Sequence, residues 1–291
     1  MERRSTLPPS PRALLKLRVA IATRVLPAVL GLYGALRELG HEPVALLTVR
    51  DAAGRYGNVD IGGLLNEAPS ELDVLVPSRR SAIAPLLEAV RPDLVVCIGF
   101  PWRIPPDALA VPRLGWLNGH PSLLPRHRGP VPVAWAIRLG EPEIGVTFHR
   151  MDANLDTGPI YAQRTIEIGE YVEPDAFYPR LGPPMVDAFT EALEKLETGD
   201  EGVPQAAGDA EYETFFGDAD ARLDFTRPRE ELHRLIWAWR YTIPRGELNG
   251  ALAELDGETV RVLASSLVET EGARRVECAD GPLWLVRTEP A

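Results

Sequence analysis

The stretch Asp93-Leu94-Val95-Val96-Cys97-Ile98 decides the fold, because five consecutive apolar residues follow a single acidic one. A run of this length, rich in β-branched side chains, is typical of a strand that is buried on both faces. Such strands occur in parallel sheets, which need further strands of the same kind with helices between them. The sequence on either side of 93–98 supplies both.

Strand and helix patterns alternate through the first 200 residues. Apolar runs predict further strands at 17–23, 43–49, 73–76, 114–120, 145–149 and 160–168. Apolar spacing of three and four predicts helices at 24–39, 81–90, 130–139 and 175–197. The alternation predicts an α/β fold, namely a Rossmann-like, mostly parallel sheet with helices on both faces.

The texture of the sequence changes after residue 200. A linker rich in Gly, Ala and acidic residues is followed by a short helical pattern at 232–239 and by short strands with turns at Asp256-Gly257 and Asp280-Gly281. We expect a mobile leader at 1–16, a catalytic α/β domain at 17–200, the linker at 201–221, and a small, mostly β, OB-like domain at 222–291.

Composition and charge narrow the class of protein. Apolar residues make up 45% of the chain, charged residues 25%, and the net charge is -11, which disfavours a nucleic-acid partner. Cys97 and Cys278 are expected to be free thiols in a reducing compartment, and neither resembles a zinc ligand, so no metal is predicted. The apolar stretch at 25–36 is too short to span a membrane. A cytoplasmic protein is expected.

The segment most informative about chemistry is Asn118-Gly-His-Pro-Ser-Leu-Leu-Pro-Arg-His-Arg-Gly129. Side chains two residues apart on a strand point the same way, so Asn118 and His120 should face one side and Gly119 the other. Both polar side chains then lie at the carboxyl end of a parallel strand, where open α/β sheets bind ligands.

A second polar element is the loop Asp152-Ala-Asn-Leu-Asp156-Thr-Gly-Pro159, which lies between two predicted strands. An amide, an imidazole and a carboxylate together suit the addition of a nucleophile to a carbonyl group. Asn118 can donate to the developing oxyanion, His120 can donate or transfer a proton, and Asp156 can orient and stabilise the imidazole.

These residues closely resemble the signature of the formyltransferases that use N10-formyltetrahydrofolate. The shared pattern is Asn-x-His-x-Ser-Leu-Leu-Pro-x-x-Arg-Gly, then Gly145-Val-Thr, Met151-Asp and Leu155-Asp-Thr-Gly-Pro. The resemblance implies that Asn118, His120 and Asp156 are catalytic and that N10-formyltetrahydrofolate is the formyl donor. It also implies a pterin pocket lined by Phe100, Trp102, Arg103, Ile104, Met151, Asp152 and Leu155.

The resemblance leaves the formyl acceptor open, because the family includes methionyl-tRNA formyltransferase, glycinamide ribonucleotide formyltransferase, sugar N-formyltransferases and a 10-formyltetrahydrofolate hydrolase domain. The segments Asp224-Phe-Thr-Arg-Pro, Ile236-Trp-Ala-Trp and Cys278-Ala-Asp-Gly-Pro-Leu resemble the C-terminal domain of methionyl-tRNA formyltransferase. The acidic charge balance nevertheless favours a small metabolite with a primary amine or hydroxylamine, such as an amino sugar or a modified amino acid.

Three alternatives stay open beside that hypothesis. The acceptor could be initiator methionyl-tRNA, water could replace the amine in a hydrolase, or the chain could bind folate without catalysis. The sequence does not reveal the oligomeric state, and a homodimer remains open.

Several conspicuous side chains have a structural reading beside a functional one. A lone histidine is more often structural than catalytic, and this reading is preferred for His41, His127, His149 and His233. Trp237 and Trp239 cannot both face inward on one helix, so one is expected at the domain junction, either in interdomain packing or at a substrate or partner. Arg126 and Arg128 fit either an anionic part of a substrate or a solvated surface.

Overall fold

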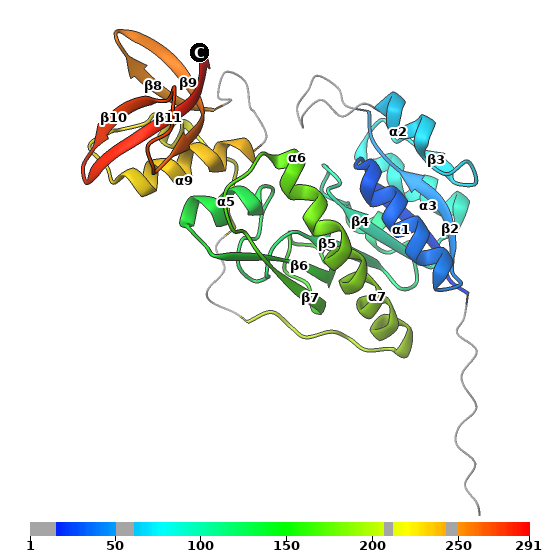
Figure 1. Ribbon diagram of the computed structural model, residues 1–291. Helices are drawn as coiled ribbons and strands as arrows, with labels where there is room; N and C mark the ends of the chain where they lie inside the picture. Colours follow the sequence, from blue (N-terminus) through cyan, green and yellow to red (C-terminus); the bar gives the residue numbers. More distant parts are fainter. Residues whose placement is uncertain (1–15, 51–60, 207–211, 243–249) are drawn as a thin grey trace, which may run out of the picture.

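The computed structural model describes residues 16–50, 61–206, 212–242 and 250–291 (Figure 1). Apart from Lys16, the predicted leader at 1–16 lies outside the described residues. None of the helices in the described ranges is long and apolar enough to cross a membrane.

A seven-stranded sheet, counted over the described residues, forms the larger part of the molecule, in the order β3-β2-β1-β4-β5-β6-β7. Its strands are β1 (Arg18–Thr23), β2 (Glu42–Leu47), β3 (Asp73–Leu75), β4 (Leu94–Ile98), β5 (Trp116–His120), β6 (Glu143–Arg150) and β7 (Ile160–Glu167). The first five run parallel, whereas β6 and β7 are antiparallel to their neighbours. The predicted mostly parallel α/β sheet is confirmed.

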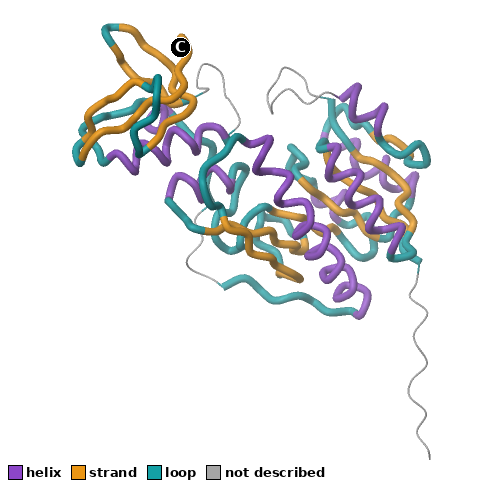
Figure 2. The backbone as a smooth tube through the Cα atoms, in the orientation of Figure 1, coloured by secondary structure: helices purple, strands orange, loops and turns teal. Residues whose placement is uncertain are grey.

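Helices cover both faces of this sheet, as Figures 1 and 2 show. The helices of this part are α1 (Leu26–Glu38), α2 (Ile61–Glu67), α3 (Ile83–Val90), α4 (Pro106–Leu109), α5 (Pro132–Leu139), α6 (Pro174–Phe177) and α7 (Gly182–Thr198). Alternate residues of β1 and β4 enter two separate apolar clusters, one under α1 and α7 and the other under α3 and α4. This two-sided burial accounts for the uninterrupted apolar run at 94–98.

The prediction of a single helix at 175–197 is wrong in its first part. The chain forms α6, then a 3-10 turn η2 (Tyr178–Leu181), and only then α7. Pro179, Pro183 and Pro184 lack the backbone N–H that a continuing helix needs, so each stands within the first three positions of a new helical segment. The short helices α2 and α4 were not predicted, because neither shows several turns of periodic apolar spacing.

A second, antiparallel sheet has four strands within the described ranges, in the order β10-β11-β9-β8, and is curled. Its strands are β8 (Ala251–Leu255), β9 (Glu258–Ser266), β10 (Arg274–Cys278) and β11 (Gly281–Pro290). The predicted turns join β8 to β9 and β10 to β11, with Asp256, Gly257 and Gly281 at positive φ. Before this sheet stand α8 (Asp218–Ala221), which falls inside the predicted linker, and α9 (Arg229–Arg240).

Helix α9 joins the two sheets. It packs against α5 on one side and against β8, β9 and β11 on the other (Figure 1). Leu232, Leu235 and Ile236 of this helix belong to the same buried apolar cluster as Phe148 in the larger sheet and Leu283 in the smaller one. The two sheets therefore share one continuous core, and the predicted domain boundaries stay a prediction.

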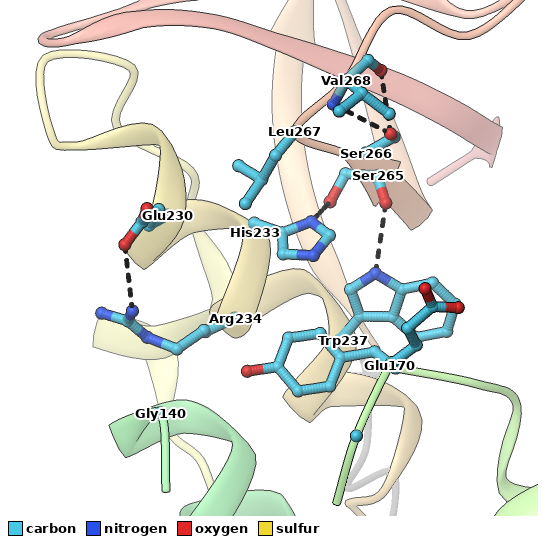
Figure 3. Close-up of a pocket in the computed structure, with 12 residues that line it drawn as sticks. Gly140, Glu170, Glu230, His233, Arg234, Trp237, Ser265, Ser266, Leu267 and Val268 are labelled. Carbon is cyan, nitrogen blue, oxygen red and sulfur yellow. Dashed lines mark hydrogen bonds and ion pairs between the residues drawn. The ribbon is translucent and has the colours of Figure 1, made fainter. Parts of the chain in front are cut away.

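The two tryptophans of α9 point to different surroundings at this junction. Trp239 is buried, donates from Nε1 to Asp220 O at 2.7 Å, and lies 5.4 Å from the ring of Phe216. Trp237 donates to Ser265 O at 3.2 Å and lines a cavity of about 540 Å³ between α5, α9 and β9 (Figure 3). None of the site residues predicted from the sequence is among those that line this cavity.

Candidate active site

Asn118 and His120 stand at the carboxyl end of β5, where the parallel part of the sheet ends. Gly119 between them points to the opposite face, because a Cβ built on it would approach the ring of Phe148 to 2.8 Å. The ring of Phe148 belongs to the core under α1 and α7. The predicted alternation is confirmed, and it places the amide and the imidazole on the side away from that core.

His149 is paired directly with Asn118 across the antiparallel contact of β5 and β6. Nδ1 of His149 lies 3.0 Å from Arg150 O, which can only accept, so Nδ1 carries the proton. Nε2 is then the acceptor for the Asn118 amide, whose Nδ2 lies 3.0 Å away. One of the two amide N–H bonds of Asn118 is thus used for orientation, and the other can serve a ligand.

Burial keeps His149 neutral. Desolvation lowers the pKa of His149 from its usual value to about 4, although the nearby carboxylate of Asp156 acts in the opposite direction. The neutral form is the one that leaves Nε2 free to accept from Asn118. The structural reading of His149 from the sequence missed this contact with a predicted catalytic residue.

His120 is only 6% exposed and is held by one ring nitrogen. Its Nε2 lies 2.9 Å from His127 O, and since a carbonyl oxygen accepts, Nε2–H is the donor. Nδ1, on the other side of the ring, points toward Asp156 Oδ1 at 3.8 Å. The backbone contact therefore leaves Nδ1 as the ring atom that can exchange a proton within the site.

Asp156 completes the cluster from the loop between β6 and β7. Its backbone adopts a left-handed conformation, with φ +58. Oδ2 accepts the backbone N–H of Gly129 at 3.0 Å, and Oδ1 lies 3.8 Å from both His120 Nδ1 and His149 Nε2. The structure thus brings together the three residues predicted from the sequence and adds His149 to them.

The loop that follows β5 is tied down by Thr147 of the neighbouring strand. Thr147 Oγ1 donates to Ser122 O at 2.6 Å and accepts from Leu124 N at 3.2 Å. Farther along, Ser122 Oγ donates to Arg126 O at 2.8 Å. The His127 carbonyl that orients His120 therefore belongs to a loop whose backbone is hydrogen-bonded at Ser122, Leu124 and Arg126.

The two segments predicted to form the pterin pocket lie next to each other. Ile104 is buried in the apolar cluster under α3 and α4, and Phe100, Trp102 and Met151 pack against the same cluster. Phe100 and Trp102 meet edge to face, with ring centroids 6.3 Å apart. These side chains form an apolar wall beside β5, because Met151 N donates to Trp116 O at the start of that strand and Phe100 closely follows Ile98, which pairs with Gly119 near its end.

The polar members of the predicted pterin set have local roles in the structure. Arg103 hydrogen-bonds the backbone carbonyl of Ala153 and so joins the two segments. Asp152 accepts from Asn154 N and from Thr157 Oγ1, each at 2.8 Å, which is a local capping role. Leu155 is 39% exposed. Contact of these residues with pterin stays a prediction.

The basic run after Leu124 is engaged with neighbouring side chains and is not simply a solvated surface. Arg126 forms an ion pair with Glu141 at 2.8 Å. His127 is buried, and its Nδ1 lies 3.0 Å from Glu213 Oε2. Arg128 donates to the side-chain oxygen of Gln205. Two of these partners, Glu213 and Gln205, come from the predicted linker.

The arrangement offers a directed amide N–H, an imidazole with one free nitrogen, and a carboxylate beside both. Such a set can stabilise an oxyanion and relay a proton during addition to a carbonyl carbon. Within the described part of the chain, no group of His, Cys, Asp and Glu side chains is arranged to hold a metal ion.

Known proteins resemble this chain in sequence and in fold. A family model described as formyl transferase matches residues 70–193. Methionyl-tRNA formyltransferase of Pseudomonas fluorescens is 35% identical, over 82% of this chain and 75% of its own length. The enzyme of the same name from Pseudomonas putida is 34% identical, over 88% of this chain and 86% of its own.

Solved structures with lower identity have the same fold. A sugar N-formyltransferase from Shewanella has a TM-score of 0.65 at 18% identity, covering 87% of this chain and 99% of its own. HypX from Aquifex aeolicus in complex with tetrahydrofolic acid has a TM-score of 0.64 at 20% identity, covering 94% of this chain but only 44% of its own. Given this fold, the matched family model and relatives at 34–35% identity, the chain belongs to the formyl transferase family.

Proposed function

We propose that the protein transfers the formyl group of N10-formyltetrahydrofolate to a primary amine or hydroxylamine of a small metabolite. The observation that carries the proposal is the convergence of Asn118, His120 and Asp156 at the carboxyl end of β5. Membership of the formyl transferase family supports formyl as the transferred group.

Each of the three side chains has a distinct role in this proposal. The acceptor nitrogen attacks the formyl carbon, and the N–H of Asn118 that is not bonded to His149 donates to the resulting oxyanion. His120, fixed through Nε2, shares that stabilisation and exchanges a proton through Nδ1. Asp156 stabilises the positive charge that develops on the acceptor nitrogen as it attacks, and accepts the proton that this nitrogen loses. The bond from the formyl carbon to N10 of the donor then breaks, the carbonyl group re-forms, and a proton passes to N10 through His120 Nδ1.

The apolar wall beside these residues fits the donor. Phe100, Trp102, Ile104 and Met151 offer aromatic and aliphatic contact to a planar heterocycle. HypX, which shares the fold, was solved with tetrahydrofolic acid. Phe100, Trp102, Arg103, Ile104, Met151, Asp152 and Leu155 remain the proposed pterin-pocket residues.

The charge distribution of the described residues from 212 onward favours a small acceptor. Phosphate contacts in a nucleic-acid complex require cations that are free to replace counterions. Carboxylates already pair with the following arginines of this part of the chain: Arg222, Arg227, Arg234, Arg240, Arg261, Arg274, Arg275 and Arg287. Most arginines among the described residues of this part are therefore already paired, which leaves them little positive charge to hold an RNA backbone.

Methionyl-tRNA is the second candidate acceptor. The relatives at 34–35% identity are named methionyl-tRNA formyltransferases, and their match to this chain extends over more than four fifths of it. A gel-shift titration with methionyl-tRNA at low salt separates the two candidates. We expect weak binding, and tight, salt-sensitive binding would overturn the preference for a small acceptor.

Hydrolysis of the donor is a third possibility with a simple control. If water is the acceptor, the donor loses its formyl group at full rate when no amine is added. We expect this loss to be slow until an amine is supplied.

The catalytic assignment is tested by truncating one donor at a time. Loss of an oxyanion-hole donor costs roughly 10²- to 10³-fold in kcat. We therefore expect the kcat of Asn118→Ala and of His120→Ala to fall by about this factor, while both variants remain folded. Far-ultraviolet circular dichroism and the thermal midpoint verify folding. A folded variant of either kind with near-native turnover would contradict the assignment.

A further inference from the structure

The side chain of Gln205 forms four hydrogen bonds between the two loops of the candidate site. Its Oε1 accepts from Arg128 Nε at 3.1 Å and from Arg128 Nη2 at 2.6 Å. Its Nε2 donates to Asp156 O at 2.9 Å and to Gly158 O at 2.8 Å. An amide has two donors and two lone pairs, so the capacity of this side chain is used completely.

The partners themselves fix which way the amide points. Arg128 offers only donors and the two carbonyl groups only acceptors, so a rotated amide would lose all four bonds. Gln205 lies in the predicted linker, 77 residues beyond Arg128 and 49 residues beyond Asp156. A segment that the sequence presents as a connection between domains thus holds both loops of the site.

One half of this contact determines the backbone at the catalytic carboxylate. Asp156 is at φ +58, a conformation that is unusual for a residue with a side chain. The carbonyl groups on either side of Thr157 both accept from Gln205, which holds the loop in this shape. The Asp156 carboxylate is thereby directed at His120 and His149.

The other half acts on the loop that orients His120. Arg128 lies between His127, whose carbonyl accepts from His120, and Gly129, whose N–H donates to Asp156. The space there is closed, because a Cβ on Gly129 would collide with the carbonyl oxygen of Glu213. A shift of Arg128 would therefore move groups that contact both His120 and Asp156.

We infer that Gln205 is a positioning residue for catalysis, which sets the distance between Asp156 and His120 by linking their two loops. The inference rests on the proposed function, in which these two side chains carry the chemistry. Gln205 itself contacts neither side chain, so it acts only through the backbone of Asp156 and through Arg128.

Two substitutions separate the halves of the contact. Gln205→Glu keeps an acceptor for Arg128 but replaces the donors to Asp156 O and Gly158 O with an oxygen that repels them. Gln205→Leu removes both halves at similar volume. Because a misplacement of about 1 Å in an active site can cost on the order of 10²-fold, we expect kcat to fall roughly 100-fold in both variants.

The readout must separate positioning from a loss of stability. We expect KM for N10-formyltetrahydrofolate to stay within about twofold, since the predicted pterin pocket is formed by other segments. Tyr241→Phe is the matched control, because it removes one hydrogen bond, from Tyr241 Oη to Val172 O at 2.6 Å, away from the site. This control should lower the thermal midpoint and leave kcat unchanged.

A double-mutant cycle with Asp156→Asn supplies the decisive comparison. If Gln205 acts through Asp156, Gln205→Leu should cost much less in the Asp156→Asn background than in the wild type. Full additivity, or wild-type kcat in folded Gln205→Glu, would overturn the inference. Failure of the wild-type protein to deformylate N10-formyltetrahydrofolate with any acceptor would instead overturn the proposed function.

Discussion

At the scale of single residues, the site depends on the hydrogen bond between Asn118 and His149. A freely rotating amide could turn its oxygen toward a developing oxyanion and repel it. The neutral His149 ring accepts at Nε2 and therefore requires the nitrogen side of the Asn118 amide to face it. Asn118 is thus oriented before any substrate arrives, which is the arrangement that oxyanion stabilisation requires.

The lowered pKa of His149 predicts how the free energy of unfolding changes with pH. Burial lowers the pKa of His149 to about 4 in the folded chain, whereas an unfolded histidine titrates near 6.5. The unfolded state therefore takes up the proton first, so the contribution of His149 is complete above pH 6.5 and is lost as the pH falls toward 4. The loss amounts to roughly 3 kcal/mol in the free energy of unfolding.

Chemical denaturation at several pH values compares the wild type with His149→Leu. The variant should show a shallower fall in unfolding free energy over this window. Some slope should remain, because burial also lowers the pKa of His233 to about 4. Identical slopes in the two proteins would contradict the assigned protonation state of His149.

The sequence identified Asn118, His120 and Asp156 because each lies in a motif with a recognisable order of residues. His149 carries no such signal. Its pairing with Asn118 depends on the register between β5 and β6, which are separated by a loop and by α5, and no local pattern specifies that register. The same limitation applies to Gln205, whose contacts cross a much longer stretch of chain.

At the scale of secondary structure, α7 supports the sheet beneath the site. Phe189 of this helix is fully buried, and its ring lies 5.5 Å from Phe148 of β6. Phe148 in turn occupies the space beside Gly119, where a side chain would not fit. The packing of α7 therefore supports β5 at Gly119, which lies between Asn118 and His120.

Removal of one aromatic ring tests this support. Phe189→Ala should lower the free energy of unfolding by about 3–5 kcal/mol, since it leaves a cavity in a fully packed region. Urea denaturation measures the change. Glu194→Ala on the exposed side of the same helix is the control and should stay within roughly 0.5 kcal/mol. A loss below about 1 kcal/mol for Phe189→Ala would contradict the packing described.

The strands were easier to predict from the sequence than the helix boundaries. Short apolar runs with β-branched residues located all seven strands of the larger sheet within a few residues. The region at 174–198 appeared as one helix because its apolar spacing continues across the prolines that divide it. Here the missing N–H groups of proline outweigh a favourable apolar pattern.

At the scale of the whole molecule, the C-terminal sheet is part of one core with the catalytic sheet. Helix α9 contributes buried residues to both, and the linker reaches back to the site through Gln205 and Glu213. Composition suggested two independent units joined by a connection. The composition of the linker could not reveal these contacts, because they are made between residues distant in sequence.

The formyl donor has stronger support than the formyl acceptor. The cluster of Asn118, His120 and Asp156 and the apolar wall support formyl transfer from a folate, whereas the small amine is a proposal that rests on charge. The ion pairs of the described C-terminal residues are the observation behind the proposal of a small acceptor.

The most direct test of the central claim is mass spectrometry of a panel of small amines incubated with the protein and N10-formyltetrahydrofolate. We predict that one class of amine gains the mass of one carbonyl group as the donor loses its formyl group, and that His120→Ala abolishes most of this conversion. If folded wild-type protein formylates neither a small amine nor methionyl-tRNA, and the donor keeps its formyl group, the central claim is wrong.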